Sequence, residues 1–124
     1  MEVKSYKDLV VWHKAMDMTY LAYRVTADLP GRRAIRLDLT DAEGRGFGPA
    51  NIAEGHRRSS TKDYLRFLSI AAGSLAEVET LIELASRLYL IRSTHMEELA
   101  GLVEEVGKML RALQQRVEAR LPSP

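Results

Sequence analysis

The sequence contains no cysteine, which excludes a disulfide-stabilised scaffold, a thiol nucleophile and cysteine-ligated zinc or iron–sulfur sites. No apolar run approaches the ~20 residues that a membrane-spanning helix needs, and the first residues carry no apolar signal core. The 18 basic residues nearly balance the 17 acidic ones, so any basic surface must be local. We therefore expect a cytoplasmic protein without membrane association.

Helical periodicity dominates what is present. The 124 residues, 46% hydrophobic and 28% charged, have the size and composition of one globular domain spanning residues 1–124. Apolar residues recur at three- and four-residue intervals over residues 6–28, 61–90 and 95–121, which predicts three long amphipathic helices. Capping patterns open each of them, at Ser5–Asp8, Ser60–Asp63 and Thr94–Glu97. Alternating runs typical of strands are absent, so the sequence predicts an all-α fold.

Each predicted helix carries an apolar stripe that should face the core. The second clear helix has Tyr64, Leu68, Ala71, Leu75, Val78, Ile82, Ala85 and Tyr89, and the third has Leu99, Leu102, Val106, Leu110, Leu113, Val117 and Leu121. The first helix has a stripe at Leu9, Trp12, Met16, Tyr20 and Tyr23, and a second apolar line at Val11, Ala15, Met18, Ala22 and Val25. Two apolar sides indicate either a wide core face or an oligomer interface.

Residues 31–48 break the helical pattern. Gly44, Gly46 and Gly48 alternate before Pro49, and each interior glycine costs a helix ~1 kcal/mol relative to alanine. The glycine run lacks the preceding strand and the GK[ST] ending of a phosphate-binding loop. We interpret the segment as loop-like.

Three motifs suggest a family. Residues 51–55 (NIAEG) are followed by residues 58–68 (RSSTKDYLRFL) and residues 70–77 (IAAGSLAE), and the chain opens with YKDLVVW at residues 6–12. Together these motifs resemble the four-helix-bundle proteins named after open reading frames in 23S ribosomal RNA intervening sequences. A related branch is the accessory variability protein of diversity-generating retroelements. The motifs cover most of the chain in order.

The resemblance implies an antiparallel up-down four-helix bundle that assembles as a ring of five copies. Most members of the family have no assigned activity, and the retroelement branch is understood to bind a reverse transcriptase and nucleic acid. The motif residues that the resemblance marks are Asn51, Glu54, Gly55, Ser74 and Glu77. We expect a structural role for the core motif, with Glu54 pairing with Arg58 one turn later and Gly55 allowing close approach of a neighbour. A polar patch for a partner is the competing interpretation.

Residues 31–48 depart from the family, whose second helix has the form LTSQMRRAAVSVP at the place of residues 37–49. The spacing from Leu37 to Gly55 is unchanged. Permitted codons for residues 37–49, shifted by one base, encode that family string in register. We therefore hypothesise two compensating frameshifts, near residues 31–36 and near Pro49. Genomic reads showing an unshifted frame with unrelated codons would contradict this. The second helix should then be shortened or irregular at its start, beginning near Pro49 or Asn51.

Nothing in the sequence indicates an enzyme. The three histidines lack the spacing of a metal site, although His13 and Asp17 are one turn apart. No serine lies in a nucleophile elbow, and no Glu-x-x-His pair of a di-iron bundle occurs. We expect no catalytic residues, no metal and no cofactor.

The charges are unevenly placed. Residues 31–66 carry eight basic and five acidic residues, residues 74–105 carry seven acidic and two basic ones, and residues 106–124 return to a net +3. The candidate nucleic-acid-binding residues form two patches, Arg57, Arg58, Lys62 and Arg66, and Lys108, Arg111, Arg116 and Arg120. Repeated in a homo-oligomer, they predict binding to RNA, DNA or a ribonucleoprotein partner. The alternative is a protein–protein scaffold that uses the acidic 77–105 face.

Overall fold

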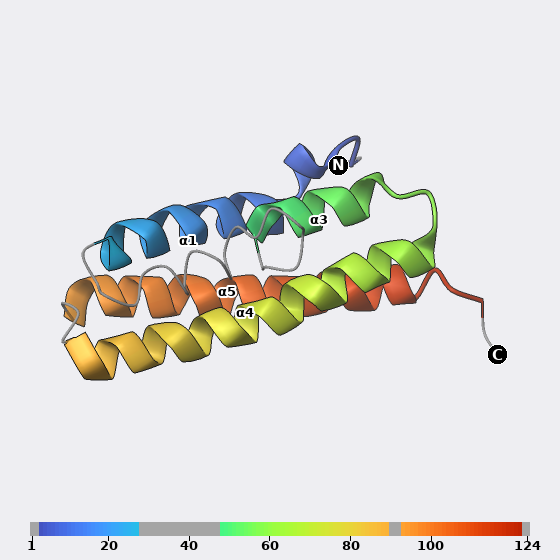
Figure 1. Ribbon diagram of the computed structural model, residues 1–124. Helices are drawn as coiled ribbons and strands as arrows, with labels where there is room; N and C mark the ends of the chain where they lie inside the picture. Colours follow the sequence, from blue (N-terminus) through green and yellow to red (C-terminus); the bar gives the residue numbers. More distant parts are fainter. Residues whose placement is uncertain (1–2, 28–47, 90–92, 123–124) are drawn as a thin grey trace.

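The computed structural model describes residues 3–27, 48–89 and 93–122 (Figure 1). Its elements are a 3₁₀ turn η1 (Tyr6–Asp8) and the helices α1 (Val10–Thr26), α3 (Gly48–Arg57), α4 (Thr61–Tyr89) and α5 (Ser93–Glu118). These ranges contain no strand, and none of their helices is both long and apolar enough to cross a membrane. The predicted all-α fold is confirmed.

The helices form an antiparallel up-down bundle. α3 packs on α4, α4 on α5, and α5 on α1, while α1 and α3 also touch each other. Figure 1 shows α4 and α5 running the length of the molecule, with α1 and α3 along one side of the pair. The short α3 begins at Gly48 and carries Pro49 in its first turn, where a missing N–H costs nothing. The predicted late start of this helix stays a prediction, because residues 28–47, with Gly44, Gly46 and most of the hypothesised frameshifted segment, lie outside the described residues.

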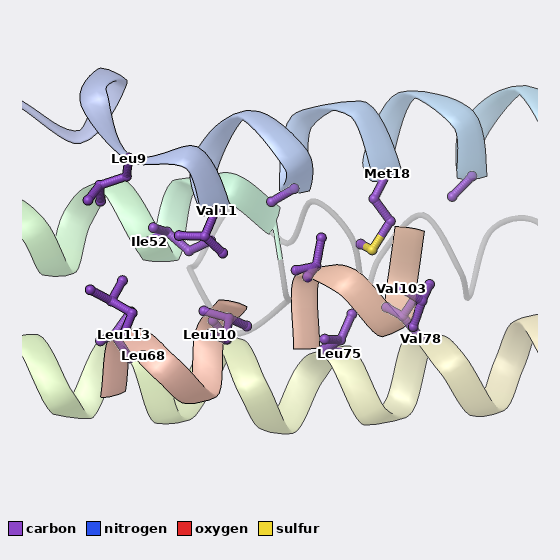
Figure 2. Packing of buried hydrophobic residues seen from close by; sticks show 14 of the residues in the cluster. Leu9, Val11, Met18, Ile52, Leu68, Leu75, Val78, Val103, Leu110 and Leu113 are labelled. Carbon is purple, nitrogen blue, oxygen red and sulfur yellow. The ribbon is translucent and has the colours of Figure 1, made fainter. Parts of the chain in front are cut away.

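The core runs along the axis of the bundle and follows the stripes of α4 and α5. All of the predicted stripe of α4 from Tyr64 to Ala85 is buried, and so are Leu99, Val106, Leu110, Leu113 and Val117 of α5. In Figure 2, Leu68 of α4 and Leu110 of α5 lie below Ile52 of α3 and Val11 of α1. Leu102 is only half-buried, and Val103 takes the buried place beside it.

In α1 only one of the two apolar lines is largely buried. The buried face consists of Val11, Ala15, Met18 and Ala22, which was the second line, whereas Met16 and Tyr20 of the first line are 46% and 64% exposed. Threonine hydroxyls complete the buried face without unpaired groups, because Thr19 and Thr26 donate to the carbonyls of Ala15 and Ala22. α1 therefore leaves an apolar strip outside the core.

Two predicted helix starts differ from the structure. The Ser5–Asp8 capping box is present, but it caps η1, and the extended backbone of Leu9 (φ −82°, ψ 122°) separates that turn from α1. α5 begins at Ser93, so Thr94 lies inside the helix and the predicted N-cap there is wrong. At Ser60 the expected cap is formed, since its Oγ accepts from the Asp63 amide at 3.3 Å.

Asp8→Asn is expected to destabilise the fold at neutral pH and to have little effect in acid. The Asp8 carboxylate accepts hydrogen bonds from the amides of Lys4 and Ser5 at 2.9 and 3.2 Å, and these bonds lower the pKa of Asp8 below 3.8. A carboxyl with a lowered folded-state pKa stabilises the fold above its unfolded pKa, and this contribution is lost as the pH falls through the folded pKa. Urea denaturation of both proteins should give midpoints that differ at pH 7 and converge in acid. A difference independent of pH would contradict this assignment.

Candidate nucleic-acid interface

A cavity of about 280 Å³ lies at the end of the bundle where the α3–α4 corner meets the last turn of α5. Three parts of the chain build its wall, namely the N-terminal segment, the corner with the start of α4, and α5. The lining residues are Val3, Leu9, His56, Arg58, Ser59, Ser60, Thr61, Tyr64, Leu113, Arg116 and Arg120. We call this the end pocket. Its lining, as far as the described residues form it, holds three arginines and no carboxylate.

Close contact between α3 and α4 positions the corner of the end pocket. Gly55 is buried against α4, where a Cβ at this position would lie 2.9 Å from the Cβ of Phe67 and 3.1 Å from Cδ1 of Tyr64. The amide of Arg58 donates to the Gly55 carbonyl at 3.1 Å, which closes the turn after α3. The glycine thus lets α3 end directly on α4 and directs Arg58 to the bundle end.

Arg58 is held on two sides. Its guanidinium pairs with Glu54 at 2.8 Å, which is the expected i,i+4 pair, and lies 5.0 Å from the centre of the Phe67 ring. Arg66 lies 4.7 Å from the same ring and pairs with Asp63 at 3.7 Å. These contacts order both arginines, but exposed pairs of this kind contribute only about 0–1 kcal/mol of stability, so Arg58 can exchange Glu54 for another anion.

Arg116 of α5 and Arg120, which lies just beyond the last residue of α5, also line the end pocket. Both are exposed, and within the described residues neither forms an ion pair. Burial raises the pKa of the Tyr64 phenol, and the positive charges of Arg120 and Arg116 act in the opposite direction. The phenol therefore stays neutral at physiological pH beside two unneutralised guanidinium groups.

The positive charge of the end pocket comes from side chains and not from helix dipoles. α4 begins at Thr61, so its positive end points to this pocket, whereas the negative ends of α3 and α5 lie at the same end of the bundle. These partial charges offset one another. Arg58, Arg116 and Arg120 are thus the source of the local potential.

The two predicted basic patches are divided differently in the structure. Arg58 of the first patch joins Arg116 and Arg120 of the second in the end pocket. Lys108 and Arg111 lie elsewhere, in a groove with Glu79 and Glu104, and Lys108 pairs with Glu104 at 3.2 Å. Arg116 follows Arg111 by five residues, and a helix rotates by ~500° over five residues. The two side chains therefore lie about 140° apart around the helix axis. The four cations of the second patch thus do not form one line.

Arg57, Lys62 and Arg66 are exposed beside the end pocket but do not line it. Arg57 and Lys62 form no ion pair within the described residues. They extend the positive surface beyond the pocket mouth. Tyr64 was expected only as a core residue, and its part in the pocket wall depends on how α5 packs beside it.

The other motif residues lie away from the pocket wall. Asn51 and Ser74 are 3% and 6% exposed, as suits a structural role, whereas Glu54 and Glu77 are exposed. His13 does not pair with Asp17, because its Nε2 lies 2.7 Å from the Lys7 carbonyl. Across the described part of the chain, no three His, Asp or Glu side chains gather as a metal site would require.

Comparison with known proteins places most of this architecture in one family. The family model described as "23S rRNA-intervening sequence protein" matches residues 7–112. Among curated proteins no significant match to the chain was found. The matched range includes Gly55 and Arg58 and ends before Arg116 and Arg120, so two of the three pocket arginines lie beyond it.

Proposed function

Because the chain belongs to the 23S rRNA-intervening sequence protein family, we propose that it is a non-enzymatic, oligomeric module of the cytoplasm that binds nucleic acid or a ribonucleoprotein partner. Such a partner includes a complex that contains a reverse transcriptase. The observation that carries the proposal is the end pocket, whose described lining includes Arg58, Arg116 and Arg120, the last two without an ion-pair partner among the described residues.

Phosphate chemistry supports this assignment of the pocket. Arginine presents a planar set of donors that matches phosphate oxygens in a bidentate geometry. Cations that neutralise phosphates also release condensed counterions, so a protein of low net charge can bind nucleic acid through a local cluster. Arg57 and Lys62 at the pocket mouth would contact neighbouring phosphates of the same strand.

The exposed apolar strip of α1 supports the oligomeric part of the proposal. Met16 and Tyr20 face outward, and covering them with a second copy would remove apolar surface from water. The resemblance implies five copies in a ring. Each ring would then present five end pockets, and linked sites raise the overall affinity well above that of one pocket.

Arg116→Gln/Arg120→Gln is expected to weaken binding of a 20-nucleotide single-stranded RNA or DNA about 100-fold at low salt. A hydrogen bond to a charged group contributes about 1.5 kcal/mol or more, and each 1.4 kcal/mol is about tenfold in affinity. Fluorescence anisotropy with a labelled strand measures the effect. Both side chains are exposed, so the variant should keep the wild-type melting temperature.

Lys108→Gln/Arg111→Gln is the matched control, since it removes the same charge from residues of α5 that lie in a different groove. The affinity of this variant for the labelled strand should stay within about threefold of the wild-type affinity, because Lys108 is already paired with Glu104. Loss of that exposed ion pair should also change the stability of the fold little. Equal losses in both variants would contradict the assignment to the end pocket. Absence of binding by the wild-type protein would favour the scaffold that uses the acidic face.

A further inference from the structure

We propose that the end pocket holds a terminal, phosphorylated nucleotide of a single strand, with the phosphomonoester on the arginines and the sugar and base against the apolar wall. This inference rests on the proposed function and narrows its ligand. It concerns a half-open surface pocket of about 280 Å³ at the end of the bundle.

The charge of the pocket favours a strand end over the middle of a strand. A phosphomonoester carries close to two negative charges at pH 7, since its second pKa is about 6, whereas each internal phosphodiester carries one. Among the described residues, Arg58, Arg116 and Arg120 line the cavity and no carboxylate does. Arg58 is paired with Glu54 at 2.8 Å, whereas Arg116 and Arg120 have no ion-pair partner among the described residues. A site with several cations gains more from a dianion than from a monoanion.

A hydroxyl at the corner adds a donor of fixed position. The Oγ of Ser60 accepts from the Asp63 amide at 3.3 Å, so its hydrogen remains to be donated. Ser59 and Thr61 stand on either side of it in the lining. Hydroxyl donors beside arginines are a common way to complete the hydrogen bonds of a phosphate group.

The remaining wall is apolar and aromatic. Leu9, Leu113 and Tyr64 form the floor of the pocket, although each is less than 10% exposed, and the half-buried His56 ring lies 5.8 Å from the Tyr64 ring at an interplanar angle of 88°. Unpaired bases bind by contact with such rings and apolar groups. A base inside a duplex cannot enter a cavity of this size without leaving its stack, so an unpaired terminal nucleotide fits and a blunt duplex end does not.

Single-stranded RNA 10-mers of one sequence, with a 5′-phosphate, a 3′-phosphate or hydroxyls at both ends, test the inference with the full chain by anisotropy. The label is attached internally. We expect wild type to bind one phosphorylated strand about tenfold more tightly than the hydroxyl strand, because a charge-assisted contact is gained. A blunt duplex with the same phosphate should lose this preference.

The variants separate this inference from the proposed function. Arg116→Gln/Arg120→Gln should bring the ratio of phosphorylated to hydroxyl affinity to about 1, and Lys108→Gln/Arg111→Gln should keep the ratio of wild type. Equal affinity of wild type for all three strands, with loss of that affinity in the first variant, overturns the terminal-nucleotide inference and leaves the proposed function standing. Absence of strand binding by wild type overturns both.

Discussion

Leu110→Ala is expected to lower the free energy of unfolding by about 2–5 kcal/mol. Leu110 is 1% exposed and lies where α5 faces α4 and Val11 of α1 (Figure 2). Truncation removes apolar atoms from the core and leaves a cavity that the surrounding helices can fill only partly, so the transfer and cavity costs add. Urea denaturation followed by circular dichroism measures the change.

The control for this substitution is Leu88→Ala. Leu88 has the same side chain on the neighbouring helix but is 65% exposed, so its truncation should change the free energy of unfolding by no more than about 0.5 kcal/mol. Comparable losses in the two variants would show that Leu110 does not occupy the core of the folded protein.

Gly55→Ala is expected to destabilise the protein by about 1–3 kcal/mol, although alanine is the better helix former. The new Cβ would lie 2.9 Å from the Cβ of Phe67, an atom attached directly to the α4 backbone, so α3 must move away from α4. The gain of ~1 kcal/mol in helix propensity does not offset lost packing between two helices. Because Arg58 follows within the same turn, strand binding should weaken as well.

Gly73→Ala is expected to have the opposite effect on stability, and Gly73 lies in α4, the helix against which Gly55 packs. No atom lies within 4 Å of a Cβ built at this exposed site in α4, so the substitution should raise the free energy of unfolding by about 0.5–1 kcal/mol. Thermal melting of the two variants distinguishes close packing from propensity. Stabilisation by both would contradict the close approach of α3 and α4.

Periodicity predicted the buried faces of α4 and α5 well because one apolar stripe runs along most of each helix, although Leu84 and Leu88 of α4 lie outside that stripe and are exposed. In α1 both lines are apolar, and hydrophobic pattern alone cannot rank them. The buried line of α1 also includes Thr19 and Thr26, whose hydroxyls donate to carbonyls of the same helix. Two core positions of α1 are therefore polar residue types, which a search for apolar periodicity does not count. Met16 and Tyr20 are large and apolar yet exposed, which the pattern could not show.

The end pocket was only partly predictable. Sequence clusters identified both basic patches, and the angular separation of Arg111 and Arg116 was available from helix geometry. The meeting of Arg58 with Arg116 and Arg120 depends on how three helices end at one place, which no local spacing records. The same holds for Tyr64, whose stripe position predicts burial but not its place in the wall of a cavity.

Size-exclusion chromatography with light scattering, recording absorbance at wavelengths for protein and for nucleic acid, tests the proposed oligomeric nucleic-acid-binding module most directly. We predict a mass near five times the 14.0 kDa of the chain, with excess absorbance from bound nucleic acid. High salt should remove this absorbance, because binding through counterion release weakens as the salt concentration rises. A 14.0 kDa monomer without nucleic-acid absorbance at low salt would contradict it.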